Sequence, residues 1–452
     1  MSLRRNSVFF TFLLLLAGLF AVSQSGGFEV KRYFTLLAVL VEESWIPLSW
    51  IMGAAGWGWL AEWLFLGRTG REINIQVLFG IGLQLLLDWV LSWTVGLSNE
   101  LVWGLNGVGW GLLALQLVLE LQRFRRADWR GIGHWGVLLS VLPTCLLLGA
   151  CTIPPGILWP SEYGGYDVLE YHLQLPKEWM KLGRMAGLEH NVFSFLPNLV
   201  ESGYFHMALY KGSAIEAGYA AQLFSSATAV LVAWIVGRTA VSLGRRDPMA
   251  SGSDGPRVAF AVSAIYLAVP WTLVTGSIAY NEQTMMAFGA GALYLAFGRK
   301  LEYSSPSSEF RRGTAIGFLC ALSILAKPSS VLLIAAPICL VWLSTTWHRI
   351  GTFTVRLTGT ISSCLPLLAL WMTRNYFWTG NPFFPILTQR FGTGHWTSEQ
   401  ASRWHRAVSS SLSLGERIPI LLSQVHGLFH PQFGWILIPA LGISIWYVTK
   451  RR

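Results

Sequence analysis

The stretch INIQVLFGIGLQLLLDWVLSWTVGL, residues 73–97, decides the fold class of this chain. A helix of roughly 17–25 apolar residues crosses a bilayer, and this stretch is that long while carrying a single charged side chain, Asp88. Comparable runs recur along the 452 residues, of which 53% are hydrophobic and only 12% are charged. Average soluble domains carry about 25% charged residues. The sequence therefore predicts an all-α integral membrane protein.

Short basic clusters separate the apolar runs and indicate the cytoplasmic loops, where Lys and Arg accumulate. These clusters are Arg4/Arg5, Arg68/Arg71, Arg123/Arg125/Arg126/Arg130, Arg238 with Arg245/Arg246, Arg299/Lys300 with Arg311/Arg312, His348/Arg349 and Lys450–Arg452. About twelve spans are expected, near 7–24, 45–66, 73–97, 101–121, 134–153, 214–241, 257–275, 279–298, 312–327, 329–346, 353–373 and 433–449. This order places every basic cluster in the cytoplasm. A cleaved signal peptide at the first run would leave eleven spans, but an uncleaved helix is favoured.

The topology places two long loops outside the cytoplasm, roughly residues 154–213 and 374–432. Loops on one face of a helical bundle suit a functional site, because they tolerate the polar backbone that lipid excludes. Residues 1–130 contain four of the expected spans, and residues 131–452 contain both long loops.

Several other functions lack their motifs. GLNGVGWG, residues 104–111, lies inside a predicted span and fits close helix packing through Gly107 and Gly111, not a nucleotide loop. The net charge of +10 comes from separated clusters, which argues against nucleic-acid binding. For the intramembrane Asp88 we expect a structural polar pair. The cysteines have no C-x-x-C spacing and are typical of buried thiols: Cys145, Cys151, Cys320, Cys339 and Cys364.

The first long loop contains the charged stretch SEYGGYDVLEYHLQLPKEWMKLGR, residues 161–184. As a helix over 166–182, it would put Asp167, Glu170 with Tyr171, and Gln174 on one face. Leu169, Leu173 and Trp179 would lie on the other face, suited to the membrane surface. Periodicity therefore predicts an amphipathic juxtamembrane helix with carboxylates turned toward the bundle. The alternative is a solvated charged face without chemistry.

Four stretches in order resemble the C-type (GT-C) polytopic glycosyltransferases, the bacterial relatives of protein O-mannosyltransferases and lipid A aminoarabinose transferases. They are YDVLEYHLQLPKEWMKLGR (166–184), NVFSFLPNLVESGYFHMAL (191–209), SILAKPSS (323–330) and RNYFWTGNPFFP (374–385). The resemblance covers roughly residues 134–400 and implies a GT-C-like fold. In that fold residues 131–452 would form the catalytic module and residues 1–130 an N-terminal four-helix membrane extension. The implied location is a bacterial-type inner (plasma) membrane, with the active site on the extracytoplasmic face. One departure is the apolar extension that precedes the matched region.

The resemblance also implies roles for individual residues. Asp167 would be the base, with Glu170 and Glu282 as further catalytic candidates. Lys327 and Arg374 would together bind the donor phosphate. The TGNP stretch, residues 379–382, is typical of a turn on its residues alone, and we expect it to shape the second loop. No metal ligand is assigned, although the family leaves a divalent cation open. The remaining residues implied to form the substrate loops are Tyr166, Tyr171, His172, Asn375 and Asn381.

Physical alternatives remain for the charged positions. Lys327 and Arg374 stand at outer helix ends, where snorkelling also explains a cation. Glu282 stands near a helix N-terminus, where the helix dipole stabilises a carboxylate.

The predicted orientation restricts the donor. Nucleotide sugars are cytoplasmic, so an outward-facing site implies a sugar already carried by a polyprenyl phosphate or diphosphate in the membrane. The predicted function is an inverting transfer to a lipid, glycan or protein acceptor, in contact with membrane lipids and without nucleic acid. The alternatives are a transporter or flippase of a polyprenyl-linked or other anionic substrate, and a catalytically inactive scaffold. Transporters usually show internal repeats, and none is evident in the sequence.

Overall fold

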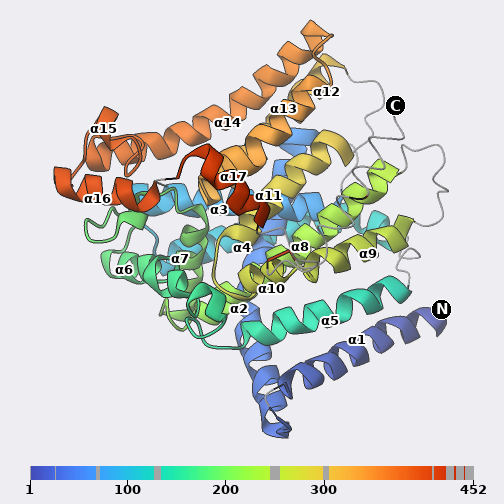
Figure 1. Cartoon of the computed structure of the whole chain (residues 1–452). Helices are drawn as coiled ribbons and strands as arrows, with labels where there is room; N and C mark the ends of the chain where they lie inside the picture. The colour runs from blue at the N-terminus through green and yellow to red at the C-terminus, as the bar shows by residue number, and fades with distance from the viewer. Residues whose placement is uncertain are drawn as a thin grey trace.

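The computed structural model of the chain is a bundle of α-helices joined by short 3₁₀ and π segments (Figure 1). It describes residues 2–25, 27–67, 72–126, 134–244, 255–298, 305–409, 412–423, 432–433 and 442. Several of the basic positions used for orientation, among them Arg68, Arg130, Arg245 and Lys300, lie outside the described residues, as does nearly all of the span expected at 433–449.

The helices follow one another with few long connections in the described part of the chain. Their bounds are α1 (Ser2–Ser23), α2 (Val30–Leu66), α3 (Ile73–Thr94), α4 (Asn99–Arg126), α5 (His134–Cys151), α6 (Gln174–Leu182), α7 (Leu199–Lys211), α8 (Gly218–Gly244), α9 (Gly255–Leu267), α10 (Pro270–Ser277), α11 (Glu282–Leu293), α12 (Pro306–Ala326), α13 (Ala336–Ser344), α14 (Ile350–Thr379), α15 (Thr388–Phe391), α16 (Ser398–Val408) and α17 (Leu414–Ser423).

Five of the described helices are long and apolar enough to cross a membrane: α2, α3, α4, α8 and α14. Helices α9 and α10 are bent by 72° at a short break and count as a sixth span if taken together. The bend falls where Pro270 begins α10, and a proline at a first helical position cannot continue the preceding helix. The chain is therefore a multi-pass membrane protein.

Five or six spans are fewer than the twelve expected. At three expected spans the described apolar helices are short, namely Phe10–Ser23, Leu139–Cys151 and Val331–Ser344. The α-helix expected to fill 279–298 ends at Leu293 and continues as a π turn. Helix α12 begins with the polar sequence PSSEFRRG, which lowers its mean hydropathy. Many segments are therefore apolar in composition without forming one long, uninterrupted apolar helix.

Small residues and amide pairs hold α2, α3 and α4 together. A Cβ on Gly56 would lie 1.8 Å from the Gly109 carbonyl oxygen, and one on Gly80 would lie 1.8 Å from that of Ala54. Gln84 donates to the side-chain oxygen of Asn106 across 2.5 Å. The close packing predicted for this region is present, but Gly109 makes it. A Cβ on either predicted glycine, Gly107 or Gly111, would meet open space.

The two long loops lie at one end of the bundle, where α6, α7, α15 and α16 gather on the left of Figure 1. They also pack against each other through aromatic side chains. The Phe195 ring of the first loop lies 4.9 Å from the Phe384 ring of the second, centroid to centroid. The Phe193 and Trp404 rings make a second contact at 6.4 Å. We call this end the loop face; the expectation that both loops share one face is met.

Candidate functional site

The first loop brings Asp167 to the loop face through a π turn, Val168–His172, that precedes α6. Asp167 is half-buried and accepts a hydrogen bond from the Tyr171 hydroxyl at 3.3 Å. The buried Tyr171 ring stacks on Phe193 with centroids 4.3 Å apart. π turns widen a helix by one residue and often occur at functional sites. Here the turn holds one carboxylate at the surface with a fixed hydroxyl donor.

A buried pair lies directly beneath this turn. His172 Nδ1 and Glu201 Oε1 are 2.7 Å apart, and both side chains are almost fully buried. Asn281 donates to the same Glu201 oxygen at 3.2 Å and to the Ala326 carbonyl at 2.9 Å. The contacts therefore join the first loop to α7, to the start of α11 and to the end of α12.

The residues that follow Asn281 and Ala326 in the chain form an ion pair. Glu282, the first residue of α11, accepts from the ammonium of Lys327, which follows α12. The Lys327 side chain is 34% exposed and that of Glu282 is 17% exposed. The ion pair therefore remains in contact with solvent, and Lys327 is accessible to an anionic ligand.

Tyr280 connects the ion pair to the first loop. Its hydroxyl donates to Glu162 at 3.1 Å, and its ring lies 5.1 Å from that of His172. Its carbonyl oxygen accepts from the Tyr204 hydroxyl at 2.7 Å. We call Glu162, Asp167, Glu201 and Glu282 the carboxylate cluster.

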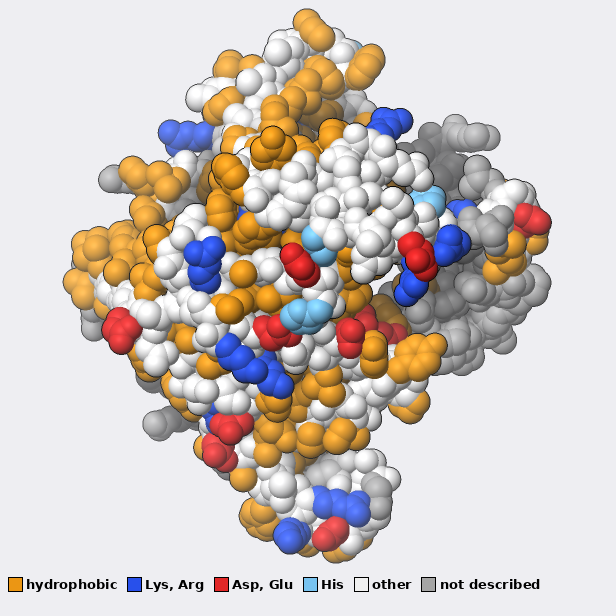
Figure 2. Space-filling model, turned by 90° about the vertical axis from the view of Figure 1, so that its left-hand side faces the viewer, with side chains coloured by type: hydrophobic (Ala, Val, Ile, Leu, Met, Phe, Trp, Pro, Cys, Tyr) orange, Lys and Arg blue, Asp and Glu red, His pale blue; other side chains and the backbone are white. Residues whose placement is uncertain are grey.

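The electrostatics of two tyrosines show that these carboxylates converge. Burial raises the pKa of Tyr280, and the negative charges of Asp167, Glu162 and Glu282 raise it further. Burial likewise raises the pKa of Tyr171, followed by the charges of Asp167, Glu282 and Glu201. Both phenols therefore remain hydrogen-bond donors at physiological pH. Figure 2 looks onto the loop face and shows acidic, basic and histidine side chains gathered over its middle.

The helix expected over 166–182 is present in two pieces, but its apolar side faces inward. Trp179 is fully buried against Phe205, with ring centroids 6.1 Å apart, and Leu173 is only 2% exposed. The expectation that Leu173 and Trp179 lie on the membrane surface was wrong, because α7 supplies a protein surface for them. Leu169 is exposed as expected.

The remaining candidates of the first loop lie at the surface. Glu170 is exposed, and its backbone oxygen accepts from Asn191 at 3.0 Å. Tyr166 is also exposed, and a hydrogen bond to Glu170 raises its pKa. They stand beside the carboxylate cluster on its solvent side.

The structure gives Arg374 a different environment from that of Lys327. The side chain is fully buried, and its guanidinium donates to the Leu196 and Pro197 carbonyl oxygens, the latter at 3.0 Å. The guanidinium carbon lies 4.6 Å from the Trp378 ring centroid and 5.5 Å from that of Trp89. No exposed atom is left for a phosphate in this arrangement. Arg374 instead fixes the end of the first loop against α14.

Two asparagines of the RNYFWTGNPFFP stretch also bind backbone. Asn375 donates to the carbonyl oxygens of Phe195 at 2.8 Å and Phe384 at 2.9 Å, so it joins the two loops. Asn381 donates to the Gly392 carbonyl at 3.0 Å and accepts from the Phe383 amide at 2.8 Å. Both side chains are fully buried. The TGNP turn shapes the second loop, as predicted.

Sequence reasoning missed Glu162, Glu201 and Tyr280. Glu201 carried a usable signal, because it is the one carboxylate of helix α7 and follows two apolar residues at its start. No local signal marked Tyr280, whose role depends on the approach of two distant segments. Asp88 forms the polar pair that was expected: its Oδ1 lies 2.7 Å from His206 Nδ1 in the buried bundle.

Chemically, the carboxylate cluster and its neighbours offer the accessible carboxylate of Asp167 and the accessible ammonium of Lys327. Tyr171 and Tyr280 add two phenolic donors. Among the described residues no group of three or more His, Cys, Asp or Glu side chains has the arrangement of a metal site. Comparison with known protein families, curated proteins and solved structures finds no match to this chain. A functional assignment therefore depends on the cluster and on the sequence resemblance.

Proposed function

We propose that this protein is a membrane glycosyltransferase that moves a sugar from a polyprenyl phosphate donor to an extracytoplasmic acceptor with inversion. The observation that carries this proposal is the half-buried Asp167 in one connected cluster with the accessible Lys327, where the two long loops meet. A base and a phosphate-binding cation are the two groups that this transfer requires.

The reaction is a single displacement at the anomeric carbon. The acceptor oxygen or nitrogen attacks this carbon as the bond to the carrier phosphate breaks, and the phosphate leaves with the electron pair. The acceptor proton passes to Asp167, which acts as general base. Tyr171 donates to the Asp167 carboxylate and so fixes the orientation of the oxygen that receives the proton.

Lys327 receives the growing charge on the leaving phosphate. In the structure its ammonium contacts Glu282, and the second oxygen of Glu282 has no hydrogen-bond partner among the described residues. The ammonium is the more exposed member of the pair, so a phosphate can approach it from the solvent side. A bound phosphate would share the ammonium with Glu282, and Glu282 is the second candidate for the base.

The finer architecture is part of the same proposal. Helices too short to cross a membrane by themselves, such as α5 and α11, would complete a GT-C-like bundle with the five long apolar helices. Residues 131–452 would then form the catalytic module and residues 1–130 an extension of it. The loop face would be extracytoplasmic in a bacterial-type inner membrane.

One observation favours the alternative of a transporter or flippase. The break between α9 and α10 resembles the discontinuous helices that line transport sites. A flippase would move the lipid-linked substrate without cleaving a glycosidic bond, so product chemistry separates the two functions.

The test uses purified protein in liposomes with a radiolabelled sugar on a short-chain polyprenyl phosphate and a mixed acceptor extract. We expect transfer to the acceptor fraction, reduced about 10²–10⁴-fold in Asp167→Asn, with donor binding retained. Glu189→Gln is the matched control, since Glu189 is an exposed carboxylate of the same loop. Transfer at wild-type rate in Asp167→Asn would exclude Asp167 as base. Movement of intact donor across the bilayer without cleavage would support the flippase.

A further inference from the structure

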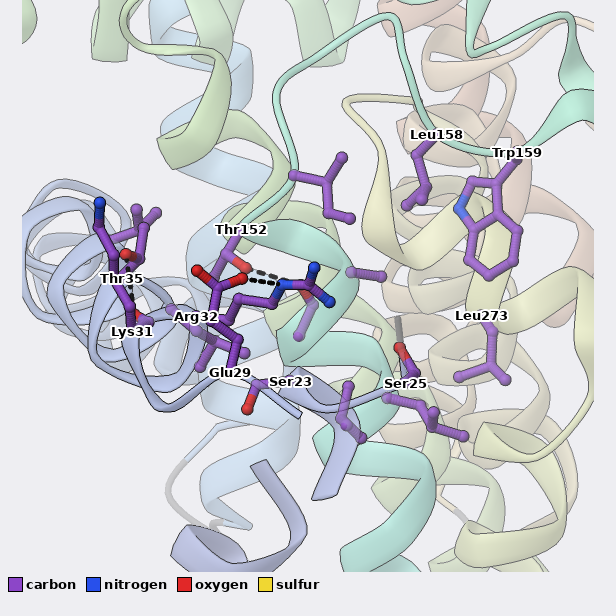
Figure 3. Close-up of a pocket in the computed structure, with 17 residues that line it drawn as sticks. Ser23, Ser25, Glu29, Lys31, Arg32, Thr35, Thr152, Leu158, Trp159 and Leu273 are labelled. Atoms are coloured by element: carbon purple, nitrogen blue, oxygen red, sulfur yellow. Dashed lines mark hydrogen bonds and ion pairs between the residues drawn. The ribbon is translucent and has the colours of Figure 1, made fainter. Parts of the chain in front are cut away.

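A pocket of about 710 Å³ lies away from the carboxylate cluster, among α1, α2, α5, α10 and the start of the first loop (Figure 3). One part of its lining is aliphatic, from Val22, Leu36, Leu146 and Leu273. The other part is polar: it contains the charged residues Glu29, Lys31 and Arg32 and the hydroxyls of Ser23, Ser25, Thr35 and Thr152. The pocket therefore suits a ligand with one polar and one apolar end.

Arg32 dominates the polar part. Figure 3 shows its guanidinium projecting from α2 into the space in front of α5. The Nε atom donates to Glu29 at 2.8 Å and Nη1 donates to the Gly27 carbonyl at 3.3 Å. Its Nη2 has no partner among the residues that the structure describes. The ion pair with Glu29 is about half exposed and so holds the guanidinium only weakly.

The surroundings of Arg32 are those of a membrane interface. Phe28 is 78% exposed and Phe34 is 63% exposed, on either side of the first turn of α2. Aromatic side chains with neighbouring cations concentrate where head groups meet the hydrocarbon. The aliphatic residues Leu36 and Leu146 extend from this level along two neighbouring helices.

We propose that this pocket binds an anionic phospholipid, with Arg32 on the phosphate and an acyl chain along Leu36, Leu146 and Leu273. A guanidinium binds phosphate oxygens with two parallel hydrogen bonds, which a point charge does not reproduce. The aliphatic wall favours a lipid over free phosphate, because aliphatic side chains form no hydrogen bonds with a soluble anion. The site is separate from the donor site proposed above and does not depend on it.

The pocket also adjoins the segment that leads to the carboxylate cluster. Trp159 forms part of the pocket wall and donates its indole N–H to Ser277 at 2.8 Å. The chain then reaches Glu162, which accepts from Tyr280. A lipid in the pocket would thus pack against the base of the loop that carries Asp167.

The test is native mass spectrometry of the purified, delipidated full chain. It is titrated with short-chain phosphatidylglycerol, with phosphatidylcholine of equal chain length, and with inorganic phosphate. We expect tighter binding of phosphatidylglycerol than of phosphatidylcholine. Arg32→Gln should weaken phosphatidylglycerol binding roughly 10- to 100-fold, the loss typical of a charge-assisted hydrogen bond. Arg390→Gln is the matched control, since Arg390 is an exposed arginine of α15.

A second variant tests the apolar part. Ala150→Phe should fill the pocket from α5 without changing the charge and should also reduce binding. Unchanged binding in either Arg32→Gln or Ala150→Phe would overturn the proposal, as would equal affinity for the two lipids. Inorganic phosphate that competes at the affinity of the lipid would show a phosphate site and not a lipid site. None of these measurements requires glycosyl transfer.

Discussion

At the scale of single residues, Lys327 and Arg374 differ in a way that their sequence contexts do not show. Both stand at the outer end of a predicted span and inside a motif of the resemblance, which predicted one shared role on a phosphate. Lys327 keeps a third of its side-chain area exposed, at 34%, whereas Arg374 is fully buried among carbonyl oxygens. The difference arises because residues 195–197 of the first loop reach across to α14, a long-range contact that local sequence does not encode.

Lys327→Ala should weaken binding of a short-chain polyprenyl phosphate by about 1.5–3 kcal/mol, because a charge-assisted hydrogen bond is lost. Isothermal titration of the purified variant measures this. Lys177→Ala, which removes a half-buried lysine of α6, is the control and should bind normally. Normal affinity in Lys327→Ala would leave Lys327 with only its ion pair to Glu282.

Arg374→Ala should destabilise the folded protein by about 3 kcal/mol or more, since it leaves buried carbonyl oxygens without a donor and removes the contact with Trp378. Arg374→Lys should recover only part of this loss, because an ammonium cannot reproduce the planar guanidinium that donates to two carbonyl oxygens through two nitrogens. Thermal unfolding in detergent measures both. Arg390→Ala, at an exposed position, should unfold like the wild type. A stable Arg374→Ala protein with reduced donor affinity would return Arg374 to the phosphate site.

At the scale of elements, the loop helix shows what periodicity can and cannot predict. The spacing of Asp167, Tyr171 and Gln174 correctly indicated helix, and the break at the π turn has no periodic signature. The apolar face was recognised, but its burial against α7 was not, because a membrane surface and a protein surface impose the same pattern. Only the contacts of Trp179 distinguish the two.

The buried pair of His172 and Glu201 should be strongly coupled. Removing one partner leaves the other buried without its hydrogen bond, a loss of about 3–5 kcal/mol if the pair is charged. The single variants His172→Ala and Glu201→Ala should each lower thermal stability, while the double variant should lose less than their sum. A matched cycle on the exposed pair Arg403–Glu399 should show coupling below about 1 kcal/mol. Additive losses at His172 and Glu201 would mean that the pair does not hold the π turn in place.

At the scale of the whole molecule, composition correctly predicted a helical, multi-pass membrane protein and overestimated the number of long apolar helices. Hydropathy counts apolar residues, whereas a span also needs an unbroken helix, and Pro270 and the π turn after Leu293 interrupt two of the expected spans. The loop motifs located Asp167 and Lys327 correctly on one face, since their helices end at the same side of the bundle. Glu201 and Tyr280 could not be assigned, because their contacts join segments far apart in the chain.

The orientation of the bundle can be tested with single cysteines and an impermeant thiol reagent in intact cells. In the proposed architecture α12 also crosses the membrane, from the exposed Ser307 near its start to Lys327 in the candidate site, so its two ends should lie on opposite sides. Cysteines replacing Ser398 and Glu216, both exposed at the loop face, should be labelled, whereas one replacing Ser307 should react only after permeabilisation. The unsubstituted chain is the control, because Cys145, Cys151 and Cys320 are buried and Cys339 and Cys364 are half-buried. Labelling of Ser307→Cys alone would put the carboxylate cluster in the cytoplasm, where nucleotide sugars are present and a lipid-linked donor is not required.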